Sequence, residues 1–207
     1  FDIPTYQPTS KTSLLLGTTV TGHGVKHFYN AAFPVLFPSI KSDLSLTNAQ
    51  LGNMTTLRLL VGGLFNLPAG FFADKFGSGR KHILASSIAL TALCCMLLGM
   101  ASSYPLIVLF ASLMSGAITL WHPSAIAWLS EGFSNRKGMA IGLHGTGGSV
   151  GEAFGPLVTG LLLKSFSWRP LLSVSVIPGV LAAFVIWICL GQVKRVAMST
   201  ITISTYI

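Results

Sequence analysis

Six long apolar stretches separated by short connectors constrain this chain more than any other feature. A helix needs about 20 mostly apolar residues to cross the hydrocarbon core of a bilayer. The stretches that meet this length are residues 13–37, 49–72, 82–100, 105–128, 138–163 and 170–192. They are too long and unbroken for the strands of a membrane barrel, which alternate apolar and polar residues over about ten positions. The sequence therefore predicts an all-α membrane protein with six transmembrane helices.

The composition also indicates lipid as the solvent. Hydrophobic residues make up 51% of the 207 residues and charged residues only 9%, too few to cover a soluble domain of this size. The excess of 13 Lys and Arg over 5 Asp and Glu does not indicate nucleic acid, because the basic residues lie mostly in the connectors. The cysteines, Cys94, Cys95 and Cys189, lie inside apolar stretches without metal-ligand spacing and are expected to pack as small hydrophobes.

The connectors carry signals for helix starts. Thr47 and Gln50 form a capping-box pattern at the beginning of the second stretch. Pro105 and Pro170 stand in the first helical turn of the fourth and sixth stretches. These positions agree with the boundaries that the apolar runs predict.

The distribution of basic residues predicts the orientation of the helices. With the amino terminus in the cytoplasm, the cytoplasmic side holds Lys11, Lys75, Arg80, Lys81, Arg136, Lys137, Lys194 and Arg195, and the opposite side holds Lys41, Lys164 and Arg169. This asymmetry places both termini in the cytoplasm. We expect a polar cytoplasmic segment at residues 1–12, a six-helix bundle at 13–192, and a cytoplasmic tail or inter-bundle linker at 193–207. Because the chain begins with Phe1, we expect it to be part of a longer gene product.

The connector at residues 70–81 has more order than a generic basic loop, which is its simplest interpretation. Asp74 places an acid at a helix end, where the helix dipole disfavours it unless a partner compensates. Gly77 and Gly79 permit a tight reversal. The Arg80 and Lys81 side chains can pair with carboxylates or lipid phosphates.

This connector resembles the loop signature of the major facilitator superfamily, Gly-x-x-x-Asp-(Arg/Lys)-x-Gly followed by basic residues. The matching positions are Gly70, Asp74, Lys75 and Gly77, with Arg80 and Lys81 as a basic pair that arrives two residues late. The resemblance implies a conformational latch that holds this bundle against the second half of a transporter.

The fifth stretch resembles the antiporter signature of the same family at Gly142, Gly151, Gly155, Pro156 and Gly160, with Thr159 where a glycine is usual. Close packing of small residues is the simpler interpretation of the glycines, whereas the Gly-Pro pair bends a helix and removes a backbone bond. In the family, this signature accompanies exporters that exchange substrate for protons. A family arginine expected in the fourth stretch is replaced by Ser112, so any proton needs another carrier.

The resemblance covers residues 13–192. Within the family, His23, Asn30 and the Trp-His-Pro element at 121–123 resemble the fosmidomycin-resistance type of exporter. The resemblance implies the amino-terminal six-helix half of a secondary transporter in the bacterial inner membrane. Its partners would be a small solute, protons, the lipid bilayer and a second six-helix bundle.

Polar residues within the apolar stretches are the candidate site. His23, Lys26, His27 and Asn30 fall on one face of the first helix. Burying a lysine at membrane depth costs about 3 kcal/mol, so this face needs water, a ligand or protein partners. Other stretches add Arg58, Asn66, His122, His144 and Glu152.

We interpret these groups as lining a central cavity between spans one, two, four and five. Its cationic character favours a small anionic or zwitterionic solute. The predicted solute-binding residues are His23, Lys26, His27, Asn30, Arg58 and His122. Glu152 with His144, His23 or His27 is the predicted proton-carrying set. Simpler interpretations are that single histidines only pack helices, that Lys26 reaches an interface, and that Arg58 pairs with Glu152.

Two other classes of function fit the sequence less well than transport. His23 and His27 could share a metal, or histidines of two helices could bind a haem, but no Cys or carboxylate cluster accompanies them, so no metal or cofactor is predicted. Nucleophile motifs, phosphate loops and paired catalytic carboxylates are missing, so no enzyme is predicted. The sequence favours a proton-coupled exporter of a small organic anion or drug-like solute. The alternative is a non-transporting accessory subunit of a larger membrane complex, because one bundle cannot enclose an alternating-access cavity alone.

Overall fold

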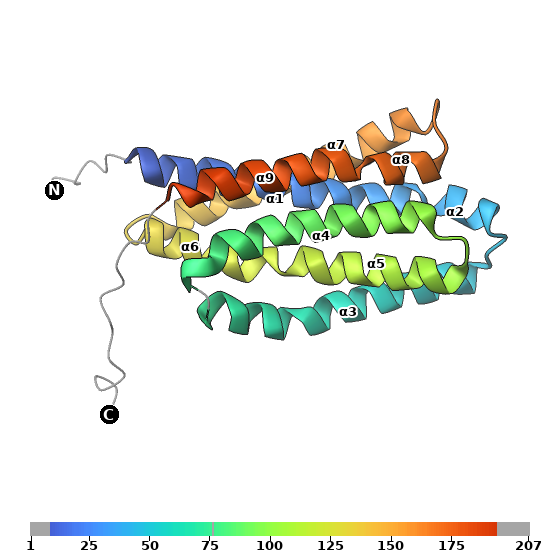
Figure 1. Ribbon diagram of the computed structural model, residues 1–207, viewed down its shortest axis with the longest axis horizontal. Helices are drawn as coiled ribbons and strands as arrows, with labels where there is room; N and C mark the ends of the chain where they lie inside the picture. Colours follow the sequence, from blue (N-terminus) through green and yellow to red (C-terminus); the bar gives the residue numbers. More distant parts are fainter. Residues whose placement is uncertain (1–8, 76, 194–207) are drawn as a thin grey trace.

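The computed structural model describes residues 9–75 and 77–193, which form a bundle of helices running along one long axis (Figure 1). The helices are α1 (Ser10–Val35), α2 (Phe37–Asp43), α3 (Asn48–Lys75), α4 (Arg80–Met100), α5 (Tyr104–Thr119), α6 (Trp121–Gly132), α7 (Lys137–Leu162), α8 (Trp168–Val174) and α9 (Val176–Gly191), with a 3₁₀ turn, η1 (Gly77–Gly79), before α4. The six predicted spans correspond to α1, α3, α4, α5 with α6, α7, and α8 with α9. The all-α architecture is confirmed. The expected tail beyond residue 193 and most of segment 1–12 lie outside the described residues.

Four of the spans are long and apolar enough to cross a membrane by composition alone: α3, α4, α5 with α6, and α8 with α9. The helices α1 and α7 are long enough, at 26 residues each, but fall below that level of hydropathy. The polar face of α1 and the glycines of α7 account for the difference. These two helices pack against each other along their lengths, so the most polar spans shield one another from lipid.

The predicted helix starts are confirmed. Thr47 N–H donates to Gln50 Oε1 over 2.8 Å, and Gln50 N–H donates to Thr47 Oγ1 over 3.2 Å, which completes the capping box before α3. Pro105 is the second residue of α5 and Pro170 the third of α8, where neither removes a hydrogen bond within the helix.

Two predicted spans are interrupted, at Leu120 between α5 and α6 and at Ser175 between α8 and α9. A proline stands four residues after the last residue of each first segment: Pro123 follows Thr119, and Pro178 follows Val174. Because proline has no N–H, it cannot donate to that carbonyl four residues earlier. The first interruption leaves His122 in the opening turn of α6 rather than in mid-helix.

Backbone contact joins α7 to α1. A Cβ atom on Gly147 would lie 2.2 Å from Val20 O, one on Gly151 2.0 Å from Gly24 O, and one on Gly155 2.6 Å from Phe28 O. Only glycine permits such an approach, so small-residue packing accounts for Gly151 and Gly155. A Cβ on Gly142 or Gly160 would meet nothing within 4 Å, so those two glycines are not required for this packing.

Two buried apolar clusters lie toward the two ends of the bundle. One gathers around Phe33, Ile40 and Trp168, and the other around Leu15, Trp121 and Leu190. Along α1, the polar residues His23 to His27 lie between Leu15 of the second cluster and Phe33 of the first. The fold therefore places them at mid-depth, with packed side chains above and below.

Candidate functional site

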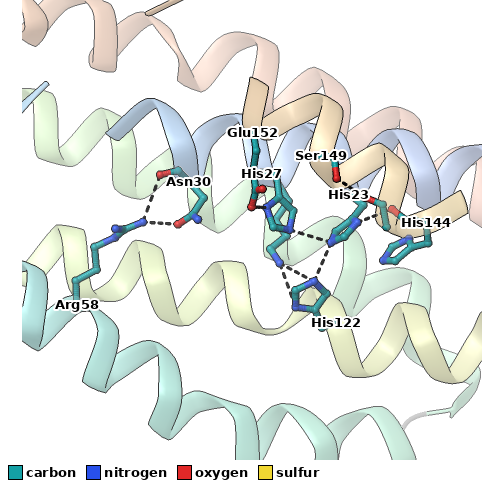
Figure 2. Close-up of polar contacts among 10 residues, drawn as sticks. His23, His27, Asn30, Arg58, His122, His144, Ser149 and Glu152 are labelled. Atoms are coloured by element: carbon teal, nitrogen blue, oxygen red, sulfur yellow. Dashed lines mark hydrogen bonds and ion pairs between the residues drawn. The ribbon is translucent and has the colours of Figure 1, made fainter. Parts of the chain in front are cut away.

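Three helices converge on a polar cluster at this mid-depth (Figure 2). Helix α1 supplies His23, Lys26 and His27 from one face, as the spacing predicts, α6 supplies His122, and α7 supplies Glu152 and the backbone of His144. We call His23, Lys26, His27, His122 and Glu152 the histidine cluster. All five were predicted site residues, and the structure brings their side chains together.

Short contacts join the five side chains of the cluster in one continuous row. Glu152 Oε1 lies 2.7 Å from His27 Nδ1, an ion-pair distance without the alignment of a hydrogen bond. His27 Nε2 lies 3.0 Å from His23 Nε2, which lies 2.8 Å from His122 Nε2. Lys26 Nζ donates to the His122 ring, 3.0 Å from Nε2 and 3.2 Å from Nδ1. The contacts therefore run from α7 through α1 to α6 without a gap.

The cluster has a buried end and an open end. Lys26 is 2% exposed and His23 is 6% exposed, whereas the side chain of Glu152 is 57% exposed. The contacts therefore connect the exposed carboxylate of Glu152 to the buried amine of Lys26.

His144 contributes differently from the prediction. Its ring stacks on His23 with centroids 3.9 Å apart and runs parallel to Trp121, while its carbonyl oxygen accepts from His23 Nδ1 over 2.7 Å. Both ring nitrogens are buried without a hydrogen-bond partner among residues 9–75 and 77–193. Glu152 contacts His27, so the closest carboxylate–histidine pair does not include His144.

Arg58 lies apart from the histidine cluster. It reaches from α3 to α1, where its Nη2 donates to the Asn30 side-chain oxygen and, over 3.5 Å, to the Asn30 carbonyl (Figure 2). The guanidinium also stands 5.2 Å from the centre of the Phe33 ring. A pairing of Arg58 with Glu152 is therefore wrong, because Glu152 lies against His27. Asn30 occupies the predicted face of α1 but binds a different helix from the histidines.

The large groove of this bundle is not the predicted cavity. It has a volume of about 1270 Å³ and is lined by mostly apolar residues of α1, α7 and α9, such as Leu16, Phe28, Phe154 and Pro178. The predicted cavity lay between spans one, two, four and five and was polar. The histidines do not line the groove; they pack against one another.

The segment from Gly70 to Lys81 joins α3 to α4 at one end of the bundle. Asp74 and Lys75 end α3, and η1 makes the reversal. None of the described glycines has positive φ, so this turn does not use the conformations open only to glycine. Lys75 lies over the Phe71 ring and Lys81 over the Trp187 ring, with Nζ 5.4 and 5.3 Å from the ring centres.

Arg80 has an internal partner that sequence reasoning missed. Its Nη1 lies 2.6 Å from Glu131 Oε2 at the end of α6, and its Nε donates to Ala73 O over 3.3 Å. Arg80 is buried, so the pair fastens this connector to α6 inside the bundle. An acid in the last turn of the fourth span, facing a basic connector at the same end, was the available signal.

Comparison with known proteins decides the family. The family model for the Major Facilitator Superfamily matches residues 20–201. The chain belongs to the Major Facilitator Superfamily. It is therefore an integral membrane protein of a transporter family, and its six spans form one half of the bundle typical of that family.

Relatives within the Major Facilitator Superfamily include several bacterial transporters. The chain is 26% identical over 183 residues to the fosmidomycin resistance protein of Escherichia coli (strain K12), covering 87% of this chain and 43% of the relative. It is 29% identical over 167 residues to a probable nitrate/nitrite antiporter NarK1 of Thermus thermophilus, covering 75% and 37%.

A solved structure of the Major Facilitator Superfamily fold agrees with this bundle. A bacterial homolog of the human lysosomal transporter Spinster, in an inward-facing and unoccupied conformation, matches with a TM-score of 0.75 at 19% identity, covering 91% of this chain and 44% of that one. The chain thus spans less than half the length of these superfamily relatives.

Proposed function

We propose that this chain is the amino-terminal half of a proton-coupled exporter of a small organic anion. The observation that carries the proposal is the contact chain from exposed Glu152 through His27 and His23 to His122 and buried Lys26. Carboxylate and imidazole groups in contact can pass a proton from an open edge to a buried site. Since Ser112 stands where the family arginine is expected, the histidine cluster is the candidate proton carrier, with Glu152 as its entry point.

The charges within the membrane favour an anionic solute. Lys26 and Arg58 are buried basic residues, and Glu152 lies in the same cluster as Lys26 but apart from Arg58. Asn30 and Arg58 offer amide and guanidinium donors, and the Arg58 Nε is buried without a partner in the described part of the chain. A carboxylate or phosphonate solute would supply the missing acceptor. One relative is named for nitrate and nitrite, which are anions.

A second six-helix bundle would complete the solute site. Large apolar side chains are exposed on α3 and α7, for example Leu64, Leu67, Phe154 and Leu157, and these faces are available to a second bundle or to lipid. We propose that Gly70, Asp74, Lys75, Gly77, Arg80 and Lys81 form a latch toward that bundle, in which Arg80 holds the connector in place through Glu131. We also propose that the Gly155–Pro156 pair lets α7 bend during exchange. We also propose that both termini lie in the cytoplasm, which the distribution of basic residues favours, and that the membrane is the bacterial inner membrane.

Proteoliposomes containing the full-length protein test the coupling. We expect an imposed proton gradient to drive transport of fosmidomycin, used as the anionic probe, and Glu152→Gln to remove the dependence on the gradient while leaving downhill exchange. The matched control is Asp43→Asn, which changes a carboxylate at a connector where it pairs with Arg169. Gradient-driven transport that survives in Glu152→Gln would contradict the proposed entry point. If no fosmidomycin moves under any gradient, the result favours the alternative, a non-transporting accessory subunit.

A further inference from the structure

Two short contacts between Nε2 atoms bring three imidazoles together in the histidine cluster. His23 and His27 come from successive turns of α1, and His122 comes from the opening turn of α6. His23 Nε2 lies 2.8 Å from His122 Nε2 and 3.0 Å from His27 Nε2, and the three histidines offer ligand atoms within 4.8 Å of one another. Three histidines with an open fourth position are a ligand set for a tetrahedral Zn²⁺ ion.

The partners of the opposite ring nitrogens determine which atoms carry hydrogen. His23 Nδ1 lies 2.7 Å from the His144 carbonyl oxygen, and a carbonyl only accepts, so Nδ1 holds the proton. His27 Nδ1 faces the Glu152 carboxylate at 2.7 Å, which also only accepts. In the neutral ring, His23 Nε2 therefore presents a bare lone pair. A proton on His27 Nδ1, on the side of the carboxylate, leaves His27 Nε2 bare as well. Metal-binding histidines are held in this tautomer by a carbonyl or carboxylate behind the ring.

Bare lone pairs that face one another repel unless a proton or a metal cation lies between them. His122 can accept from Lys26 Nζ at either ring nitrogen, at 3.0 Å from Nε2 and 3.2 Å from Nδ1, so its Nε2 is free to bind a metal when the ring proton lies on Nδ1. Ligand nitrogens around Zn²⁺ are separated by about 3.3 Å at bond lengths of about 2.0–2.1 Å. The two observed Nε2–Nε2 distances, 2.8 and 3.0 Å, are a few tenths of an ångström shorter. Small side-chain rotations would therefore bring these nitrogens to the spacing that the ion needs.

We propose that His23, His27 and His122 bind a borderline divalent cation of the Zn²⁺, Co²⁺ and Ni²⁺ class. His144 and Glu152 act as positioning residues through the Nδ1 atoms, and Lys26 opposes binding through its charge. The proposal does not depend on transport, since it concerns binding to the protein at rest. It departs from the sequence-based expectation of no metal, which considered only His23 and His27 as sharing an ion.

Titration with Co²⁺ alone tests the site, because tetrahedral Co²⁺ has a visible absorption spectrum. The full-length protein, purified in detergent without chelator, should bind one Co²⁺ with a tetrahedral spectrum, and Zn²⁺ should displace it. His27→Gln, at the partly exposed edge of the cluster, should weaken binding roughly 100-fold or abolish it, and Glu152→Gln should weaken it about 10–100-fold. The matched control is His82→Gln, because His82 is exposed and bonds Trp187.

The Lys26→Met variant separates a change in metal affinity from a folding defect, because the two change Co²⁺ binding in opposite directions. Removing the ammonium beside His122 should tighten Co²⁺ binding by roughly tenfold or more, and a damaged fold would weaken it. The proposal is overturned if wild-type protein gains no tetrahedral spectrum at millimolar Co²⁺, or if His27→Gln and His122→Gln bind as the wild type does. A failure here, with gradient-driven transport intact, would leave the exporter proposal standing.

Discussion

On its α7 side, α1 meets its neighbour backbone to backbone, whereas on its α3 side it is reached by one long side chain. Gly147, Gly151 and Gly155 bring α7 so close that any Cβ would strike the α1 backbone. Helix α3 packs instead against α5 and α6, and the Arg58 guanidinium extends from it to Asn30.

The difference separates two kinds of polar site on one helix face. The histidine cluster is built across the α1–α7 contact, so its geometry depends on a rigid backbone approach. The Arg58–Asn30 pair depends on a flexible side chain, which can turn toward a solute without moving a helix. Changes on the α7 side should therefore affect folding, and changes on the α3 side should affect binding.

The largest expected effect comes from Gly151→Leu. A leucine there must displace the α1 backbone, since even its Cβ would lie 2.0 Å from Gly24 O, and we expect a loss of about 3 kcal/mol or more. Thermal unfolding and size-exclusion chromatography in detergent should show little folded protein. Gly160→Leu is the matched control, because nothing lies within 4 Å of a Cβ at that position. If both variants lost the same amount of stability, the close α1–α7 backbone contact would not be the cause of the loss.

An intermediate effect is expected from Arg58→Met. The variant removes the guanidinium but keeps an apolar side chain, so folding should change little while the affinity for fosmidomycin falls roughly tenfold, or about 1.4 kcal/mol. Binding by the purified full-length protein and its unfolding temperature measure the two quantities. Lys164→Met, which removes an exposed cation in a connector, should leave both unchanged. An unfolded Arg58→Met variant would show that the α3 side is structural too.

The features that could be predicted from the sequence are those that depend on a single helix. The spacing of His23, Lys26 and His27 placed them on one face of α1, and the apolar runs predicted the six spans. The partners across helices were not predictable in the same way, because they depend on how each helix is rotated and shifted against the next. His122 joins the cluster from a chain segment interrupted at Leu120, and Glu152 meets His27 rather than Arg58.

The glycines of α7 show the same limit. The signature drew attention to Gly142, Gly151, Gly155 and Gly160, but the contacts require Gly151 and Gly155 together with Gly147. Their spacing of four residues indicated a packing face, and only the position of α1 shows which glycines it covers. Gly142 and Gly160 have open space around them, so packing does not explain these two glycines, and their part in transport stays a proposal.

The smallest effect that still tests the comparison is expected from Asn30→Ala. Truncation removes one of the two acceptors of a buried guanidinium, which keeps the Asn30 carbonyl oxygen as a partner, so the free energy of unfolding should fall by about 1 kcal/mol. In the Arg58→Met background, the same truncation should cost much less, because no donor is left unsatisfied. Chemical denaturation of the four proteins of this cycle measures the coupling. Additive effects would mean that the Arg58–Asn30 contact contributes nothing to stability.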